Sequence, residues 1–153
     1  MIYVVFTGAL TLVDLIVGFS TAIVVGVLSS DLVVKNSSKA FELRRWVYLL
    51  FYTLKYLTVY EFKAHLDVVK RILSPKLPVN PAIVRVPYEV DDEYAVTTIA
   101  NSITNTPGTV VVDIDVVRKV MYVHWIDAKA VEDFKAREYI SEDFEKYATK
   151  IFG

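Results

Sequence analysis

Residues 1–30 read MIYVVFTGALTLVDLIVGFSTAIVVGVLSS, and Asp14 is the only charged side chain among them. A water-soluble fold needs a polar face, so a run of this length with almost no charge indicates a membrane segment. From Lys63 onward the mixture is that of a soluble protein, because 26 of the 35 charged residues lie there. The sequence therefore predicts a membrane anchor followed by one small soluble domain.

The composition agrees with this division. Hydrophobic residues make up 54% of the 153 residues, and the mean hydropathy is +0.40, both high for an ordinary globular chain. The chain has no cysteine, which excludes disulfides, thiolate metal sites and a cysteine nucleophile. No basic residue precedes the first apolar run, so we interpret the N-terminal region as a permanent anchor and not as a cleaved signal peptide.

Charge is distributed unevenly along the chain. Residues 1–34 carry −2, residues 35–76 carry +6 and residues 77–153 carry −5. A basic segment beside apolar segments predicts contact with lipid headgroups on the cytoplasmic side. The acidic C-terminal part argues against nucleic acid as a partner.

Residues 1–74 are predicted to form two or three membrane segments. A helix needs about 20 residues to cross a bilayer, which residues 2–12 do not supply. Either the chain turns near Asp14 before a full span, which we favour, or residues 2–34 form one tilted helix roughly 50 Å long. The predicted segments are residues 2–12, 15–34 and 43–63, the last with an amphipathic extension to residue 73, and a Pro-rich linker over residues 75–81 follows.

Two ionisable residues lie within these segments. Asp14 is an ion-path or interface candidate, because a charge at membrane depth needs a partner, or it caps a helix that begins at Leu15. Lys55 is a second candidate for an ion or proton route. Alternatively, its ammonium reaches toward headgroups or pairs with Glu61.

Side-chain size points to helix packing. Gly18, Ala22 and Gly26 follow one another at intervals of four residues, a small-residue spacing that lets another helix approach closely. Tyrosines also recur every fourth residue, and such a stripe is favoured where an apolar body meets a polar rim. They are Tyr48, Tyr52, Tyr56 and Tyr60.

Residues 82–153 are predicted to form a small two-layer α+β domain with the order β-α-β-β-α. Strands are expected over residues 82–88, 109–116 and 120–126, the last two as an antiparallel pair, with helices over residues 91–104 and 128–151. In the second strand, one face should carry Val110, Val112, Ile114 and Val116, and the other should carry Asp113 and Asp115.

This domain offers no catalytic, cofactor or metal site. A lone strand histidine such as His124 is more often structural than a ligand, and Asp113 and Asp115 more often mark a solvated face than a cation site. The Thr106-Pro107-Gly108-Thr109 string lacks the spaced glycines and lysine of a phosphate-binding loop, so its expected role is to turn a helix into a strand.

Three stretches together resemble the E-type subunit of the multisubunit Mrp-type sodium/proton antiporters. They are LSPKL with the following NP (73–81), ANSITNTPGTVVVD (100–113) and MYVHWID (121–127). The resemblance spans nearly the whole chain, but the first apolar segment is shorter than is usual there, and Asn105 replaces an apolar residue. It implies structural roles for Thr104, Thr106, Pro107, Gly108, Thr109 and His124.

The resemblance implies an accessory subunit without catalytic residues, partnered by other membrane subunits and the lipid bilayer. Such subunits occur in sodium/proton antiporters and in antiporter-like arms of archaeal hydrogenase and sulfur-reducing complexes. The expected location is a prokaryotic cell membrane, multi-pass, with the C-terminal domain in the cytoplasm. The alternatives are a membrane-tethered enzyme and a membrane-tethered ligand-binding or sensor module.

Overall fold

The computed structural model describes residues 5, 8, 11–33, 39 and 41–153, and these fall into two compact units that divide between Phe41 and Glu42. The first unit contains helix α2 (Leu12–Val33), and the second contains every other described element named below. Residues 43–73, which the sequence groups with the anchor, are thus in the same unit as the sheet. Their assignment to the membrane stays a prediction.

Helix α2 is the one helix in the described part of the chain that is long and apolar enough to cross a membrane. Its qualifying stretch is Leu12–Ser30, with a mean hydropathy of 2.2. The predicted segment 2–12 lies largely outside the described residues.

The start of α2 differs from the prediction, because the helix begins at Leu12 and not at Leu15. The Asp14 amide donates to Thr11 Oγ1 (3.2 Å), and the Thr11 amide donates to Asp14 Oδ2 (3.3 Å). This reciprocal arrangement is a capping box, which satisfies amides that the first helical turn leaves without partners. Asp14 therefore supports the cap from inside the first turn instead of preceding the helix.

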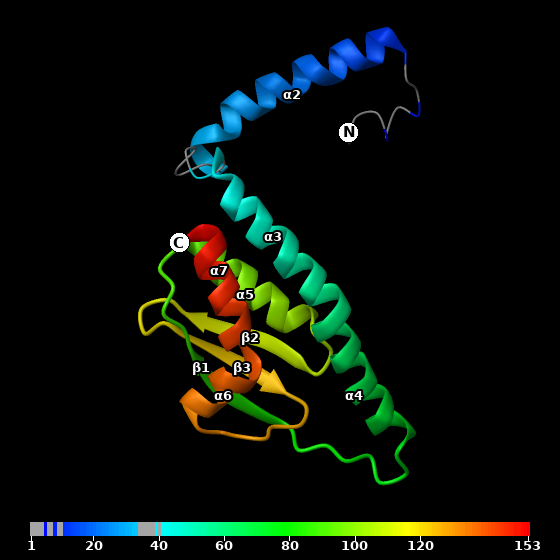
Figure 1. Ribbon diagram of the computed structural model, residues 1–153, viewed down its shortest axis with the longest axis vertical. Coiled ribbons are helices and arrows are strands. Elements are labelled where there is room, and N and C mark those ends of the chain that lie inside the picture. The colour runs from blue at the N-terminus through cyan, green and yellow to red at the C-terminus, as the bar shows by residue number, and fades with distance from the viewer. Residues whose placement is uncertain (1–4, 6–7, 9–10, 34–38, 40) are drawn as a thin grey trace. The chain divides into compact units, whose positions relative to one another are not determined.

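Helices α3 (Leu43–Lys55) and α4 (Glu61–Leu73) are joined by a π-helical turn, η2 (Tyr56–Tyr60), and Figure 1 shows them as one long helix beside α7. The long helix ends at Leu73, as predicted from Pro75. Ser74 is already extended (φ −78°, ψ 124°), the conformation that a following proline imposes.

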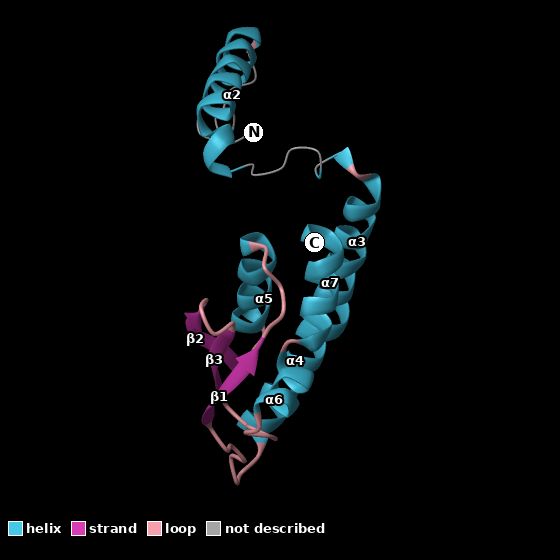
Figure 2. Ribbon diagram, turned by 90° about the vertical axis from the view of Figure 1, so that its left-hand side faces the viewer, coloured by secondary structure: helices cyan, strands magenta, loops and turns pink. Residues whose placement is uncertain are grey.

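The sheet has three antiparallel strands in the order β1-β3-β2: β1 (Ala82–Pro87), β2 (Thr109–Asp115) and β3 (Val120–Trp125). Helix α5 (Glu93–Asn105) connects β1 to β2, and α6 (Asp133–Ile140) and α7 (Glu142–Phe152) follow β3. Figure 2 shows α5 and α7 on one side of the sheet. The core lies between these layers and includes Val84, Val86, Ile99, Met121, Val123 and Ala148.

The predicted face of β2 is wrong because the strand contains a bulge. The register with β3 shifts between Val111 and Asp113, so Val112 is an extra residue. Val111 and Ile114 pack against the core, whereas Val110 and Val112 are exposed. Simple alternation fails because one inserted residue reverses the faces beyond it.

The predicted final helix over residues 128–151 is in fact two helices. Ser141, only 1% exposed, interrupts them with φ −124° and ψ −18°. Its amide donates to Arg137 O (2.9 Å) and its carbonyl accepts from Glu145 N (2.9 Å), so the backbone bonds continue while the direction changes.

The predicted linker returns to the sheet. The Asn80 amide donates to Ile126 O (3.1 Å), and the Asn80 carbonyl accepts from Ala128 N (2.8 Å). Arg71 of α4 donates to Pro78 O (2.7 Å) and pairs with Asp127 (2.8 Å). The end of the long helix is thereby fixed to the domain.

Candidate functional site

The tyrosines of the long helix face the domain, and the hydroxyls of Tyr52, Tyr56 and Tyr60 bond to α5 and α7. Tyr52 is 7% exposed and forms a short hydrogen bond with the Ser102 hydroxyl. The Tyr56 hydroxyl donates to Ser102 O (3.2 Å), and the Tyr60 hydroxyl donates to Asp143 Oδ2 (2.7 Å). The polar groups beside this stripe therefore belong to the protein itself and come from residues far away in the sequence.

Phe144 of α7 is the hub of this contact. Its ring centroid lies 6.4 Å from that of Tyr52, 5.9 Å from that of Tyr56 and 5.2 Å from that of Tyr60. The Tyr52 and Tyr60 rings meet Phe144 nearly edge-on, at 80° and 81°. Edge-to-face pairs of this kind contribute about 0.5–1.5 kcal/mol each beyond the area they bury.

The π-helical turn keeps the tyrosines in line. On a regular α-helix, residues four apart advance by 400°, so a stripe at that interval drifts by about 40° at each step. The wider turn from Tyr56 to Tyr60 counteracts this drift where the row reaches Phe144. Together the tyrosines and Phe144 form what we call the tyrosine seam (Tyr52, Tyr56, Tyr60, Phe144).

Lys55 pairs with Asp143 across the seam, and not with Glu61, the partner that one interpretation of the sequence favours. Its ammonium lies 3.5 Å from Asp143 Oδ2 and over the rings of Tyr60 (5.0 Å) and Tyr147 (5.3 Å). The hydroxyl of Tyr60, with Lys55 beside it, holds the pKa of the Asp143 carboxyl below its usual value. Lys55 thus contributes to the contact between the long helix and α7, and its part in ion movement stays a prediction.

This contact predicts a pH dependence of stability. Because the folded-state pKa of Asp143 is depressed, its contribution is present above the unfolded pKa of about 3.9 and is lost as the pH falls through the folded value. We expect Asp143→Asn to lower the free energy of unfolding of the full chain in detergent by less than about 1 kcal/mol at pH 7, since the group is half exposed.

The difference between Asp143→Asn and the parent chain should shrink as the pH falls from 5 to 2, measured by chemical denaturation at each pH. Tyr60→Phe, which removes the hydroxyl donor and keeps the carboxylate, should show part of the same pH dependence. A difference that stays constant over this range would contradict the assignment.

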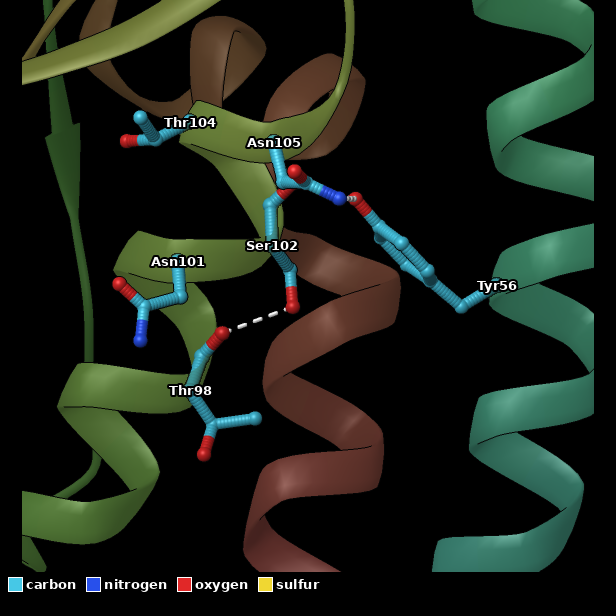
Figure 3. A pocket seen from close by; sticks show the side chains of 6 residues that line it. All are labelled: Tyr56, Thr98, Asn101, Ser102, Thr104 and Asn105. Atoms are coloured by element: carbon cyan, nitrogen blue, oxygen red, sulfur yellow. Dashed lines mark hydrogen bonds between the residues drawn. The ribbon is translucent and has the colours of Figure 1, made fainter. Parts of the chain in front are cut away.

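A polar depression of about 510 Å³ lies beside the seam (Figure 3). Asn105 Nδ2 donates to the Tyr56 hydroxyl (3.3 Å), and Ser102 Oγ donates to Thr98 O (2.7 Å). Much of its polar lining is thus already engaged within the protein. It is lined by Tyr56, Thr98, Asn101, Ser102, Thr104 and Asn105.

Hydroxyls of the Thr-Pro-Gly-Thr string and of nearby Thr104 join α5 to β2. Thr106 Oγ1 donates to Ser102 O (2.7 Å), Thr109 Oγ1 donates to Ile103 O (2.7 Å), and Thr104 Oγ1 accepts from Val111 N (3.2 Å). The first two bonds satisfy carbonyls that the end of a helix leaves open, and the third satisfies a strand amide of β2.

Gly108 is required in this turn by its backbone conformation. Its φ of +100° suits glycine alone, and an added Cβ would lie 3.1 Å from Ile126 Cγ2. With Pro107, which restricts the turn from the other side, it sets the entry into β2.

His124 lies in β3 between Ile83 of β1 and Val110 of β2, both exposed. This row is on the face of the sheet away from the core. Among the residues that the structure describes, no three His, Asp or Glu side chains lie close enough to hold a metal ion. A structural role for His124 stays a prediction.

Gly18, Ala22 and Gly26 lie within α2. No atom of the described residues lies within 4 Å of the position that a Cβ on Gly26 would take. The proposed packing role of the three residues stays a prediction, as does any part of Asp14 in ion movement.

A buried ion pair between α6 and α7 has no sequence signal that would have revealed it. Arg137 Nε donates to Glu145 Oε2 (3.0 Å), and Glu145, 5% exposed, also accepts from the Glu89 amide (2.6 Å). Arg137 further contacts the Glu89 carboxylate (2.7 Å). Arg137 and Glu145 lie eight residues apart on either side of a helix break, and this spacing gives no recognisable pattern in the sequence. Together they connect α6 and α7 to Glu89, which follows β1.

The chain has an apolar helix of spanning length and a small α+β domain to which the tyrosine seam fixes a long helix. These are features of a membrane-anchored protein in which the described contacts have a structural role. The chain belongs to the Na+/H+ ion antiporter subunit family, whose model matches residues 1–151.

Named relatives and a solved structure agree with this family. The chain is 34% identical to the E-type subunit of the Na+/H+ antiporter of Bacillus subtilis, over 88% of this chain and 83% of the relative. It is 31% identical to the E-type subunit of the Na+/H+ antiporter of Alkalihalophilus pseudofirmus, over 99% and 91% respectively. A chain in the structure of the membrane-bound sulfane sulfur reductase, an archaeal respiratory membrane complex, has a TM-score of 0.81 and 30% identity, covering 99% of this chain and 92% of that one. The named relatives are antiporter subunits, which are transporter components and not enzymes.

Proposed function

We propose that this chain is the accessory E-type subunit of a multisubunit ion-translocating complex in a prokaryotic membrane, either a sodium/proton antiporter or a related respiratory complex. The observation that carries this proposal is the match along essentially the whole chain, to the family model and to a chain of the archaeal respiratory complex. Its partners are the other membrane subunits of the complex and the bilayer.

The local geometry supports a bracing role. Lys55 is paired with Asp143 and held over aromatic rings, and the hydroxyls of the seam tyrosines bond within the domain. Groups fixed in this way hold the long helix at a set rotation against α5 and α7. A rigid subunit of this kind stabilises neighbouring membrane subunits without moving ions itself.

The placement we propose has α2 as the membrane span and the two-layer α+β domain, in the order β-α-β-β-α with its last helix divided, in the cytoplasm. The net charge of +6 over residues 35–76 favours the cytoplasmic side for the segment that follows α2. Any further crossing by residues 2–12 is part of the same proposal.

The direct test is a pull-down of the tagged chain from its native membrane in mild detergent, with mass spectrometry of the retained proteins. Large antiporter-like membrane subunits are the expected result. Metal-bearing redox subunits among them would assign the chain to a respiratory complex. Recovery of the chain alone would overturn the proposal.

The small residues of α2 supply a prediction for the same assay. The double variant Gly18→Leu with Gly26→Leu should strongly reduce co-purification of the partner subunits, because the added side chains keep a second helix from approaching. The matched control is Val17→Leu with Val24→Leu, which adds bulk on the other side of the same helix and should leave co-purification unchanged. Full recovery of partners with the glycine variant would contradict a packing role for this face.

A further inference from the structure

The side of the long helix opposite the tyrosine seam carries large apolar side chains that are exposed. They recur at helical spacing over α3 and the start of η2, with exposed fractions from 43% to 76%. We refer to them as the outward face: Leu43, Trp46, Val47, Leu50, Leu54 and Leu57. We propose that the outward face lies in the headgroup–acyl boundary of the lipid bilayer, with α3 parallel to the membrane surface; this rests on the membrane placement of α2 proposed above.

Charge is absent from this face. At 100° per residue the six side chains fall within about 60° of one line, and Tyr52 lies opposite that line. The three charged residues between 43 and 60 are engaged away from it: Arg45 donates to Ile151 O (2.7 Å), Arg44 lies over the Tyr48 ring (5.7 Å), and Lys55 pairs with Asp143. An apolar face opposite a polar, packed one is the pattern of an interfacial helix.

The hydroxyls near the outward face are satisfied by the helix itself. Thr53 Oγ1 donates to Leu49 O (2.9 Å), and Thr58 Oγ1 donates to Leu54 O (2.7 Å). These donors therefore need no water, which lowers the cost of placing this side of the helix in an apolar medium.

Side-chain size distinguishes lipid from a neighbouring membrane helix. Helices that pack together within a bilayer favour small residues at the contact, as α2 has in Gly18, Ala22 and Gly26. The outward face has leucine, valine and tryptophan instead. Trp46, at the end nearest the membrane anchor in sequence, is of the type enriched at membrane–water interfaces.

The packing of α7 favours a helix that lies along the membrane over one that crosses it. Helix α7 runs beside α3 and carries Glu142, Asp143 and Lys146, which would enter the bilayer core with a crossing α3.

The test is site-directed spin labelling of the full chain in nanodiscs of phosphatidylethanolamine and phosphatidylglycerol, which the lack of native cysteine makes direct. Single variants Leu50→Cys and Leu54→Cys report on the outward face, and Leu43→Cys and Leu57→Cys report on its two ends. Val117→Cys is the matched control, since Val117 is also an exposed apolar residue (91%) but lies in the β2–β3 turn. Val24→Cys reports on α2.

For each label, the measured quantity is the ratio of its collision rate with oxygen to that with a water-soluble nickel chelate. This ratio should be several-fold higher at positions 50 and 54 than at position 117. Positions 43 and 57 should report similar depths. If the labels at 50 and 54 are exposed to water while the label at 24 is in lipid, this inference alone is overturned. If the label at 24 is exposed to water, the membrane placement of α2 is overturned. Labels at 50 and 54 shielded from both reagents would mean a protein cover, and a depth gradient across the bilayer from 43 to 57 would mean a crossing helix; either overturns the inference.

Discussion

Replacing Arg137 with alanine is expected to lower the free energy of unfolding of the full chain by about 3 kcal/mol. Removing one member of a buried ion pair typically costs about 3–5 kcal/mol, because the other charge stays buried without its partner. Arg137 is itself 18% exposed, which places the expected cost at the low end. Chemical denaturation in mild detergent, followed by tryptophan fluorescence, measures the change.

Two variants make this result specific to the buried pair. Lys135→Ala removes an exposed ion pair with Glu132 (2.9 Å), the residue before α6, and should leave the stability nearly unchanged. Glu145→Gln keeps an acceptor for the Glu89 amide and should cost less than Arg137→Ala. Equal losses for Arg137→Ala and Lys135→Ala would show that the buried pair contributes little.

Replacing Tyr52 with alanine is expected to cost about 3–5 kcal/mol, as for other buried aromatic side chains. In addition to the lost buried area, the change removes the aromatic ring that contacts Phe144 and the hydroxyl that bonds to Ser102. We therefore expect amide hydrogen exchange in α3 to become faster at the same time. This would show that the tyrosine seam, and not helix propensity, orders α3.

The neighbouring residue is the control for this second variant. Phe51 is 60% exposed, so Phe51→Ala should cost much less and leave exchange in α3 nearly unchanged. Tyr52→Phe keeps the ring and should cost about 1 kcal/mol, the usual net contribution of one hydrogen bond. Similar losses for Tyr52→Ala and Phe51→Ala would contradict the central place given to Tyr52.

Local features of the chain are predictable from the sequence because their causes are local. The strand that begins at Ala82, the acidic start of α5 and the end of the long helix before Pro75 depend on alternation, capping and proline chemistry. Asp92 indeed caps α5 by accepting from the amides of Tyr94 (2.9 Å) and Ala95 (3.2 Å).

The failures come from contacts between distant residues and from single insertions. The tyrosine stripe suggests the rim of a membrane because its true partners, Ser102 and Phe144, lie 50 or more residues from Tyr52. The bulge at Val112 reverses a strand face without altering its composition. Glu61 is the nearest acid to Lys55 in sequence, but Asp143 is nearer in space.

The tyrosine seam also has a consequence for biosynthesis. Phe144 leaves the ribosome about 90 residues after Tyr52, which at roughly 5–20 residues per second is a delay of about 5–20 s. Through that interval α3 exists without the helix that covers its tyrosines, while α2, made earlier, is already available for membrane insertion. In the placement proposed above, the nascent chain therefore meets the bilayer first, and α7 closes the fold last.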